Sequence, residues 1–165
     1  IGKTSLSDTI TLRRNLALDT LRHPEESSAT HRPFAAFLIE VPMLLLQGNV
    51  AAGSCDSGFV YRPTLVTCSS HSTGSVQQED MNEAVATLTG FFILTGSLEA
   101  SAMCAELKGA LAWKNAHAGI ITADQTTNLK LEAVLLADNH IGIALGFLRT
   151  GDLMHRVYGD NITVL

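Results

Sequence analysis

The sequence has little charge and few aromatic side chains. Charged residues make up 16% of its 165 residues and aromatic residues 5%, against 46% hydrophobic residues. This composition excludes intrinsic disorder, because there is enough apolar surface to form a core. The length fits a single globular domain over residues 1–165. The scarcity of charge also indicates that a partner, such as a second copy of the chain, covers part of the surface.

A basic surplus and a long hydrophobic run are also missing. The 11 Lys and Arg residues stand against 16 Asp and Glu, for a net charge of −5. Without a basic patch we expect no nucleic-acid partner. The longest apolar runs, residues 41–46 and 141–148, are far shorter than the roughly 20 residues of a transmembrane helix. We therefore expect no membrane partner either.

Cysteine and histidine give little sign of a metal or cofactor. Cys55, Cys68 and Cys104 show no C-x-x-C spacing, and their odd number allows at most one internal pair. A Cys55–Cys68 disulfide and three reduced thiols both stay open. Three further histidines could converge as metal ligands, but their spacing does not require it: His117, His140 and His155. The sequon at residues 161–163 slightly favours secretion.

Short apolar runs bounded by Gly, Pro and polar residues predict strands throughout the chain. The predicted strands cover residues 33–38, 41–46, 59–67, 91–95, 119–122, 129–136, 141–148 and 157–165. The alternation of Leu129 and Leu131 with Lys130 and Glu132 is typical of a half-exposed strand.

Helical spacing of apolar residues predicts helices over residues 75–88 and 97–114, with a shorter one near residues 12–21. No internal repeat is evident. The sequence therefore predicts a β-rich or α+β fold, with an antiparallel barrel-like sheet and one or two helices.

Several segments resemble the first half of a trypsin-like serine protease, in the same order. Ile1-Gly2 is similar to the N-terminus that zymogen cleavage creates, and residues 31–38 to the first barrel strand. Residues 65–71, Leu-Val-Thr-Cys-Ser-Ser-His, resemble the strand that leads into the catalytic histidine. Residues 143–145 resemble the segment after the catalytic aspartate. The resemblance implies a secreted hydrolase with a β-barrel and a protein or peptide substrate.

The resemblance assigns catalytic roles to three residues. His71 would be the general base and Asp138 the carboxylate that orients it, although Asp138 lies five residues before the matching segment. Ser57, in Asp56-Ser57-Gly58, is the candidate nucleophile, but it precedes the histidine. No Gly-Asp-Ser-Gly-Gly follows residue 138. The chain is then an incomplete or catalytically inactive relative, because a base without its nucleophile achieves little.

Two other functions remain open. The small-residue face of residues 100–110 favours close packing between subunits, as in a small α+β shell-like protein that self-assembles. Alternatively, the chain is a small-molecule enzyme with a site between subunits, in which His71 and His140 meet nearby carboxylates. Reduced thiols and a large apolar interface would favour assembly, whereas a Cys55–Cys68 link would favour the protease.

Overall fold

A computed structural model of the chain describes residues 10–20, 34–39, 44–61, 80–94, 105–123, 129–146 and 157–165. These residues form thirteen β-strands. A six-stranded sheet contains β2 (Leu16–Leu18), β5 (Val50–Ala52), β7 (Asn82–Val85), β9 (Ala105–Trp113), β11 (Leu129–Ala137) and β13 (Val157–Val164). A five-stranded sheet contains β3 (Ala35–Ile39), β6 (Ser57–Tyr61), β8 (Thr89–Ile93), β10 (Ala118–Thr122) and β12 (Ile141–Leu145). A separate pair consists of β1 (Ile10–Arg13) and β4 (Leu44–Gln47).

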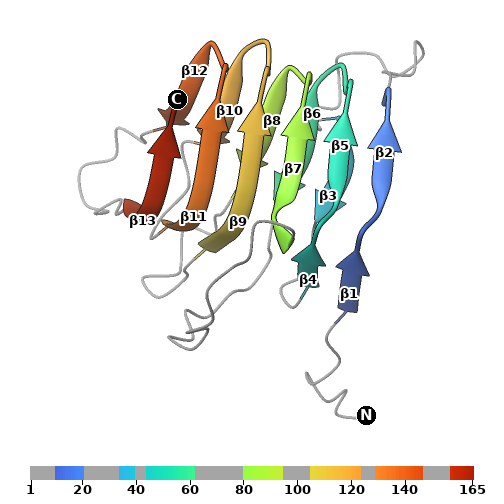
Figure 1. The fold of residues 1–165 in the computed structure, drawn as a ribbon, viewed down its shortest axis with the longest axis horizontal. Helices are drawn as coiled ribbons and strands as arrows, with labels where there is room; N and C mark the ends of the chain where they lie inside the picture. The colour runs from blue at the N-terminus through green and yellow to red at the C-terminus, as the bar shows by residue number, and fades with distance from the viewer. Residues whose placement is uncertain are drawn as a thin grey trace.

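The chain winds between the two larger sheets as a solenoid. Strands of the six-stranded and five-stranded sheets alternate along the sequence, and neighbours within each sheet are parallel. Figure 1 shows one sheet behind the other, joined by tight turns along the upper rim. This arrangement is a parallel β-helix, in which each coil lies on the one before it. The predicted antiparallel barrel is therefore wrong: every described strand pair is parallel, and both sheets are open at their first and last strands.

Small side chains let the two sheets approach each other closely. Ala51, Ala84 and Ala112 form one column on successive strands of the six-stranded sheet, and all are fully buried. Opposite them, a Cβ added at Gly58 would lie 2.9 Å from the Cβ of Ala84, and one added at Gly90 would lie 2.9 Å from that of Ala112. Since a glycine faces an alanine at each level, larger side chains do not fit there.

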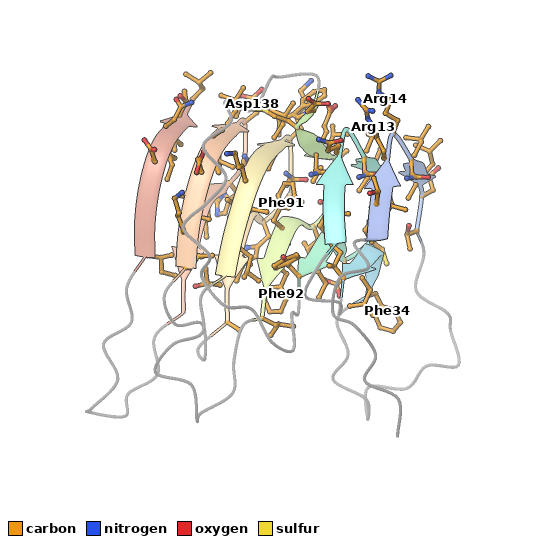
Figure 2. All side chains as sticks on the ribbon, turned by 90° about the horizontal axis from the view of Figure 1, so that it is seen from below. Arg13, Arg14, Phe34, Phe91, Phe92 and Asp138 are labelled. Carbon is orange, nitrogen blue, oxygen red and sulfur yellow. The ribbon has the colours of Figure 1, made fainter. Side chains whose placement is uncertain are left out.

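Large apolar side chains fill the rest of the core in columns of their own. The rings of Phe37, Phe59 and Phe91 stack on successive strands, with centroids 4.8 Å apart in both pairs. That spacing equals the separation of neighbouring strands, so stacked rings pack without gaps. Ile120 and Ile143 continue the same column. Figure 2 shows Phe91 in the middle of the molecule.

Positive φ angles allow the chain to pass from one sheet to the other within a few residues. We call this turn the closing corner of each coil. At its first position φ ranges from 48° at Asp19 to 70° at Gly53. The equivalent residues in the later coils also have positive φ: Ala86, Lys114 and Asp138. Non-glycine residues adopt this conformation at a cost of about 1–2 kcal/mol each, so the coil stack must hold them in place.

The predicted helix over residues 97–114 is wrong, because residues 105–113 form β9. Leu107, Ala110 and Ala112 are all buried, at spacings of three and then two. Gly109, with φ of 70°, interrupts the alternation of the strand between Leu107 and Ala110, so both of these side chains are buried. That break imitates the three-residue spacing of a helix.

The other two predicted helices are also contradicted where the structure describes them. Residues 82–85 of the segment 75–88 form β7, and residues 12–21 contribute to β1 and β2. The strand predictions fared better: the buried and half-buried residues of β11 alternate at positions 129–133 as expected. Across the described ranges no helix is long and apolar enough to span a membrane.

Candidate functional site

Asparagine side chains form a hydrogen-bonded ladder at the N-terminal ends of β2, β5 and β7. We call Asn15, Asn49 and Asn82 the first ladder. The Asn15 amide donates to Asn49 Oδ1 over 2.9 Å, and the Asn49 amide donates to Asn82 Oδ1 over 2.9 Å. Asn49 and Asn82 are buried, at 0% and 4% exposure. The ladder therefore supplies buried hydrogen-bond partners at a position where the strand ladder is interrupted.

A second ladder follows β7, β9 and β11, at the closing corners. It consists of Thr87, Asn115 and Asn139. Asn115 Oδ1 accepts from the Thr87 hydroxyl over 2.7 Å, and the Asn115 amide donates to Asn139 Oδ1 over 2.8 Å. The two ladders thus lie at opposite ends of the strands of the six-stranded sheet, and the coil of β7 contributes to both, through Asn82 and Thr87.

One geometric rule covers both ladders. Each asparagine accepts, through Oδ1, the backbone N–H of the equivalent residue in the preceding coil, as Asn49 does from Asn15 and Asn139 does from Asn115. Its Nδ2 donates to the carbonyl three residues before that equivalent residue. The acceptors are Leu12 for Asn49, Leu46 for Asn82, Ala84 for Asn115 and Ala112 for Asn139. The carboxamide therefore forms hydrogen bonds with the backbone of the parallel coil that precedes it.

The second ladder ends at Ser54, which precedes Thr87 in the same column. Ser54 is 3% exposed, and its hydroxyl is the only buried side-chain polar atom without a hydrogen-bond partner among the described residues. A serine is too short to reach the acceptors that an asparagine would reach here. Burial therefore takes the Ser54 hydroxyl out of water without giving it a hydrogen bond in return.

Charged residues gather on the outer face of β9 and β11. Glu132 accepts from Lys108 over 2.8 Å and from Lys130 over 2.6 Å. The hydrogen bond from Lys108, followed by that from Lys130, lowers the pKa of the Glu132 carboxyl. Asp160 lies opposite Glu132 on the neighbouring strand β13. This cluster pairs charges between coils.

Of the three residues expected to form a catalytic set, the structure describes two, Ser57 and Asp138, and these two lie in different coils. Ser57 is 2% exposed in β6, and its hydroxyl donates to Asp56 Oδ1 over 3.4 Å. Asp138 is exposed at the closing corner between β11 and β12, and β10 and β8 separate β12 from β6 in the sheet order. Figure 2 shows Asp138 at the rim of the molecule. His71 lies outside the described residues, so its predicted role as base stays a prediction.

Other candidate ligands do not make a metal site in the described part of the chain. His117 and His140 are exposed at equivalent corner positions of neighbouring coils, and Ile141 N donates to the His117 carbonyl. No group of three or more potential metal ligands occurs among the described residues. Cys55 is an exposed free thiol, whereas Cys68, Cys104 and His155 lie outside the described residues.

Exposed apolar side chains concentrate at the two ends of the solenoid. We call β1, β2 and β3 the N-terminal end, and β12 with β13 and Leu165 the C-terminal end. The described residues include seven exposed large hydrophobic side chains, and only Leu88 lies between the ends. The others are Leu16 (62%), Leu18 (61%), Leu38 (53%), Leu145 (38%), Val164 (58%) and Leu165 (80%). The end faces therefore combine apolar side chains with outermost strands.

Comparison with known proteins adds no assignment: no protein-family model, no curated protein and no solved structure matches this chain. The candidate functional surfaces are therefore the ones its own geometry shows, the two ends and the ladders that lead to them.

Sequence reasoning missed the ladders, although a signal was present. Residues 15–20, 49–54 and 82–87 read Asn-Leu-Ala-Leu-Asp-Thr, Asn-Val-Ala-Ala-Gly-Ser and Asn-Glu-Ala-Val-Ala-Thr. Each begins with a ladder asparagine, places an inward alanine third and ends at the closing corner. Aligning these three hexapeptides reveals the internal repeat.

Proposed function

We propose that this protein is a structural module that associates with copies of itself through the ends of its solenoid. The observation that carries the proposal is the location of the exposed apolar side chains. Among the described residues, six of the seven large ones lie on the terminal coils. The described end strands present leucine and valine beside outermost strand edges, which favours pairing with another chain.

A scaffold function fits the rest of the described surface. The charged side chains of β9 and β11 pair with one another, and Ser57 is buried. The core columns repeat from coil to coil, so adding a subunit would extend an existing pattern. The hypothesis of serine protease kinship stays a prediction, because His71 lies outside the described residues.

Sedimentation velocity over a hundredfold range of protein concentration tests this function. We expect the average mass to rise with concentration. Val164→Lys should reduce that rise, because it places a charge in the contact. Leu88→Lys, which changes the exposed leucine between the ends, is the matched control and should associate like the unchanged chain. A chain that stays monomeric throughout, at concentrations where it is folded by circular dichroism, would contradict the proposal.

A further inference from the structure

The first ladder has an incomplete rung at the N-terminal end. Asn49 and Asn82 each bind the coil before them through Oδ1 and Nδ2. Asn15 has no such coil in the described structure. Its Nδ2 donates to Asn49 Oδ1 and to the carbonyl of Arg13, within its own strand region, over 3.2 Å. Among the described residues, no donor is bonded to Asn15 Oδ1. This side chain is equipped to bind one more parallel coil.

The C-terminal end presents the backbone that such a coil requires. Strand register carries the first-ladder column from Asn82 through Ala110 and Val134 to Ile162. Ile162 is thus the last residue in the column that Asn15 begins. Its N–H and the carbonyl of Gly159, three residues earlier, correspond to the groups that Asn49 binds at Asn15 and Leu12. Both belong to β13, the outermost strand of its sheet.

Charge is complementary between the two ends in a neighbouring column. Arg13 of the N-terminal end is 52% exposed, and its column continues through Gln47 and Asp80. The same column reaches Lys108, Glu132 and finally Asp160 at the C-terminal end. Parallel stacking of two copies therefore places an Asp160 beside an Arg13. A two-fold contact would instead join two C-terminal ends or two N-terminal ends, and it would pair no Arg13 with an Asp160.

We propose that copies of this chain stack head to tail, with Asn15 of one copy hydrogen-bonded to Ile162 N and Gly159 O of the copy before it. This inference rests on the proposed function. It adds the direction in which the copies stack and the strand register between them. β13 pairs in parallel with β1 and β2 of the next copy, which brings Val164 beside Ala17 and Leu165 beside Leu18. The contact is heterologous, so subunits add without closing into a dimer.

The junction forms through the six-stranded sheet and its continuation into β1. The five-stranded sheet ends one strand earlier, at β12. Stacking therefore leaves a single strand position between β12 and the β3 of the next copy. Leu145 and Leu38, which are exposed in one copy, border this position from either side.

Two blocked variants test the polarity. Leu18→Lys blocks the N-terminal end and Val164→Lys the C-terminal end. Head-to-tail stacking predicts that each variant alone is monomeric, and that an equimolar mixture forms a one-to-one dimer and nothing larger. A variant that still dimerises alone would overturn the inference and leave self-association standing. An unchanged chain that is monomeric throughout would overturn the proposed function itself.

Two further variants test the register. Asn15→Ala should weaken self-association about tenfold, because two hydrogen bonds are lost at each junction. Arg13→Asp and Asp160→Arg should each weaken association, whereas the double variant R13D/D160R should recover it within one chain. Recovery in the double variant excludes contacts between identical ends, because such contacts bring no residue 13 beside a residue 160. Failure to recover, with an unchanged circular dichroism spectrum, would overturn the assigned register.

Discussion

The N-terminal and C-terminal coils place the side-chain amides that hydrogen-bond their backbones at different ends of the strands. In the N-terminal coils, side-chain amides of the first ladder supply the hydrogen bonds at the start of the strand, through Asn49 and Asn82. In the C-terminal coils that position is filled by apolar side chains, Ala110 and Val134, which are 0% and 2% exposed. There the hydrogen bonding moves to the closing corner, at Asn115 and Asn139.

The change of corner coincides with a change in strand length. β4 and β5 are separate strands around Gly48 and Asn49, whereas β9 runs continuously from residue 105 to residue 113. An interrupted strand exposes backbone groups that a carboxamide must satisfy. A continuous strand satisfies them through its own ladder and leaves room for an apolar core. Amide ladders therefore lie where strand pairing is broken.

The largest loss of folding stability is expected from a substitution where the two sheets touch, in the middle of the solenoid. A Cβ at Gly90 would lie 2.9 Å from the Cβ of Ala112 in the other sheet, and 2.6 Å from the carbonyl oxygen of Gly119, a backbone atom of the neighbouring strand. Gly90→Ala should destabilise the fold by about 3 kcal/mol, in the range of severe overpacking. Denaturant unfolding measures the loss.

Gly142→Ala is the control for that substitution. Its added Cβ would lie 3.1 Å from a side-chain methyl of Val164, at the C-terminal end. The valine can move, so we expect a cost below about 1 kcal/mol. Equal costs at Gly90 and Gly142 would contradict the close contact between the sheets.

The next largest effect concerns the ladders themselves. Asn115→Ala removes a buried carboxamide and leaves the Thr87 N–H without its acceptor, so a loss of about 2–3 kcal/mol is expected. Asn49→Ala should cost as much. Native-state hydrogen exchange should show faster exchange near Thr87 in the first variant and near Asn15 in the second. Exchange that speeds up uniformly in both would argue against two separate ladders.

A smaller effect separates the ends of the second ladder. Thr87→Ala loses a hydroxyl that donates to Asn115 Oδ1, so about 1–2 kcal/mol of stability should be lost. Ser54→Ala removes a buried hydroxyl that has no partner, and its effect should stay within about 0.5 kcal/mol of zero or be stabilising. Thermal unfolding of the two variants measures both changes in stability. A large loss at Ser54 would mean that its hydroxyl is bonded after all.

The smallest effect is a pH dependence in the C-terminal coils. Because Lys108 and Lys130 lower the pKa of Glu132 in the folded chain, ionised Glu132 stabilises the fold above its ordinary pKa. That contribution is lost as the pH falls through the lowered value. The stability difference between the unchanged chain and Glu132→Gln should therefore be constant near neutral pH and shrink in acid. A difference that grows in acid would reverse the sign of this linkage.

Part of this fold could be predicted from the sequence. The alternation at Leu129 and Lys130 identifies a half-exposed strand, and the structure places β11 there. Strand direction could not be predicted, since alternation with a period of two is common to parallel and antiparallel sheets. Gly109 misled the helix prediction, because its positive φ changes the alternation within β9.

The repeat was hidden by unequal coil lengths. Successive ladder residues are separated by 34, 33, 28 and 24 positions, so no fixed period exists. Asn49 beside Gly48 has the sequence of an ordinary turn, and nothing local distinguishes a ladder asparagine from a turn asparagine. Ser57 and Asp138 were chosen by resemblance to short segments, which carry no information on which coils they occupy.

Methyl contacts between successive coils test the parallel solenoid most directly. In a sample with labelled alanine methyl groups, nuclear Overhauser spectra should connect Ala51 with Ala84, and Ala84 with Ala112, because parallel strands stack these residues about 4.8 Å apart. Seeing both contacts would confirm the coil register on which the ladders and the stacking depend. Their absence in a folded sample would contradict the account.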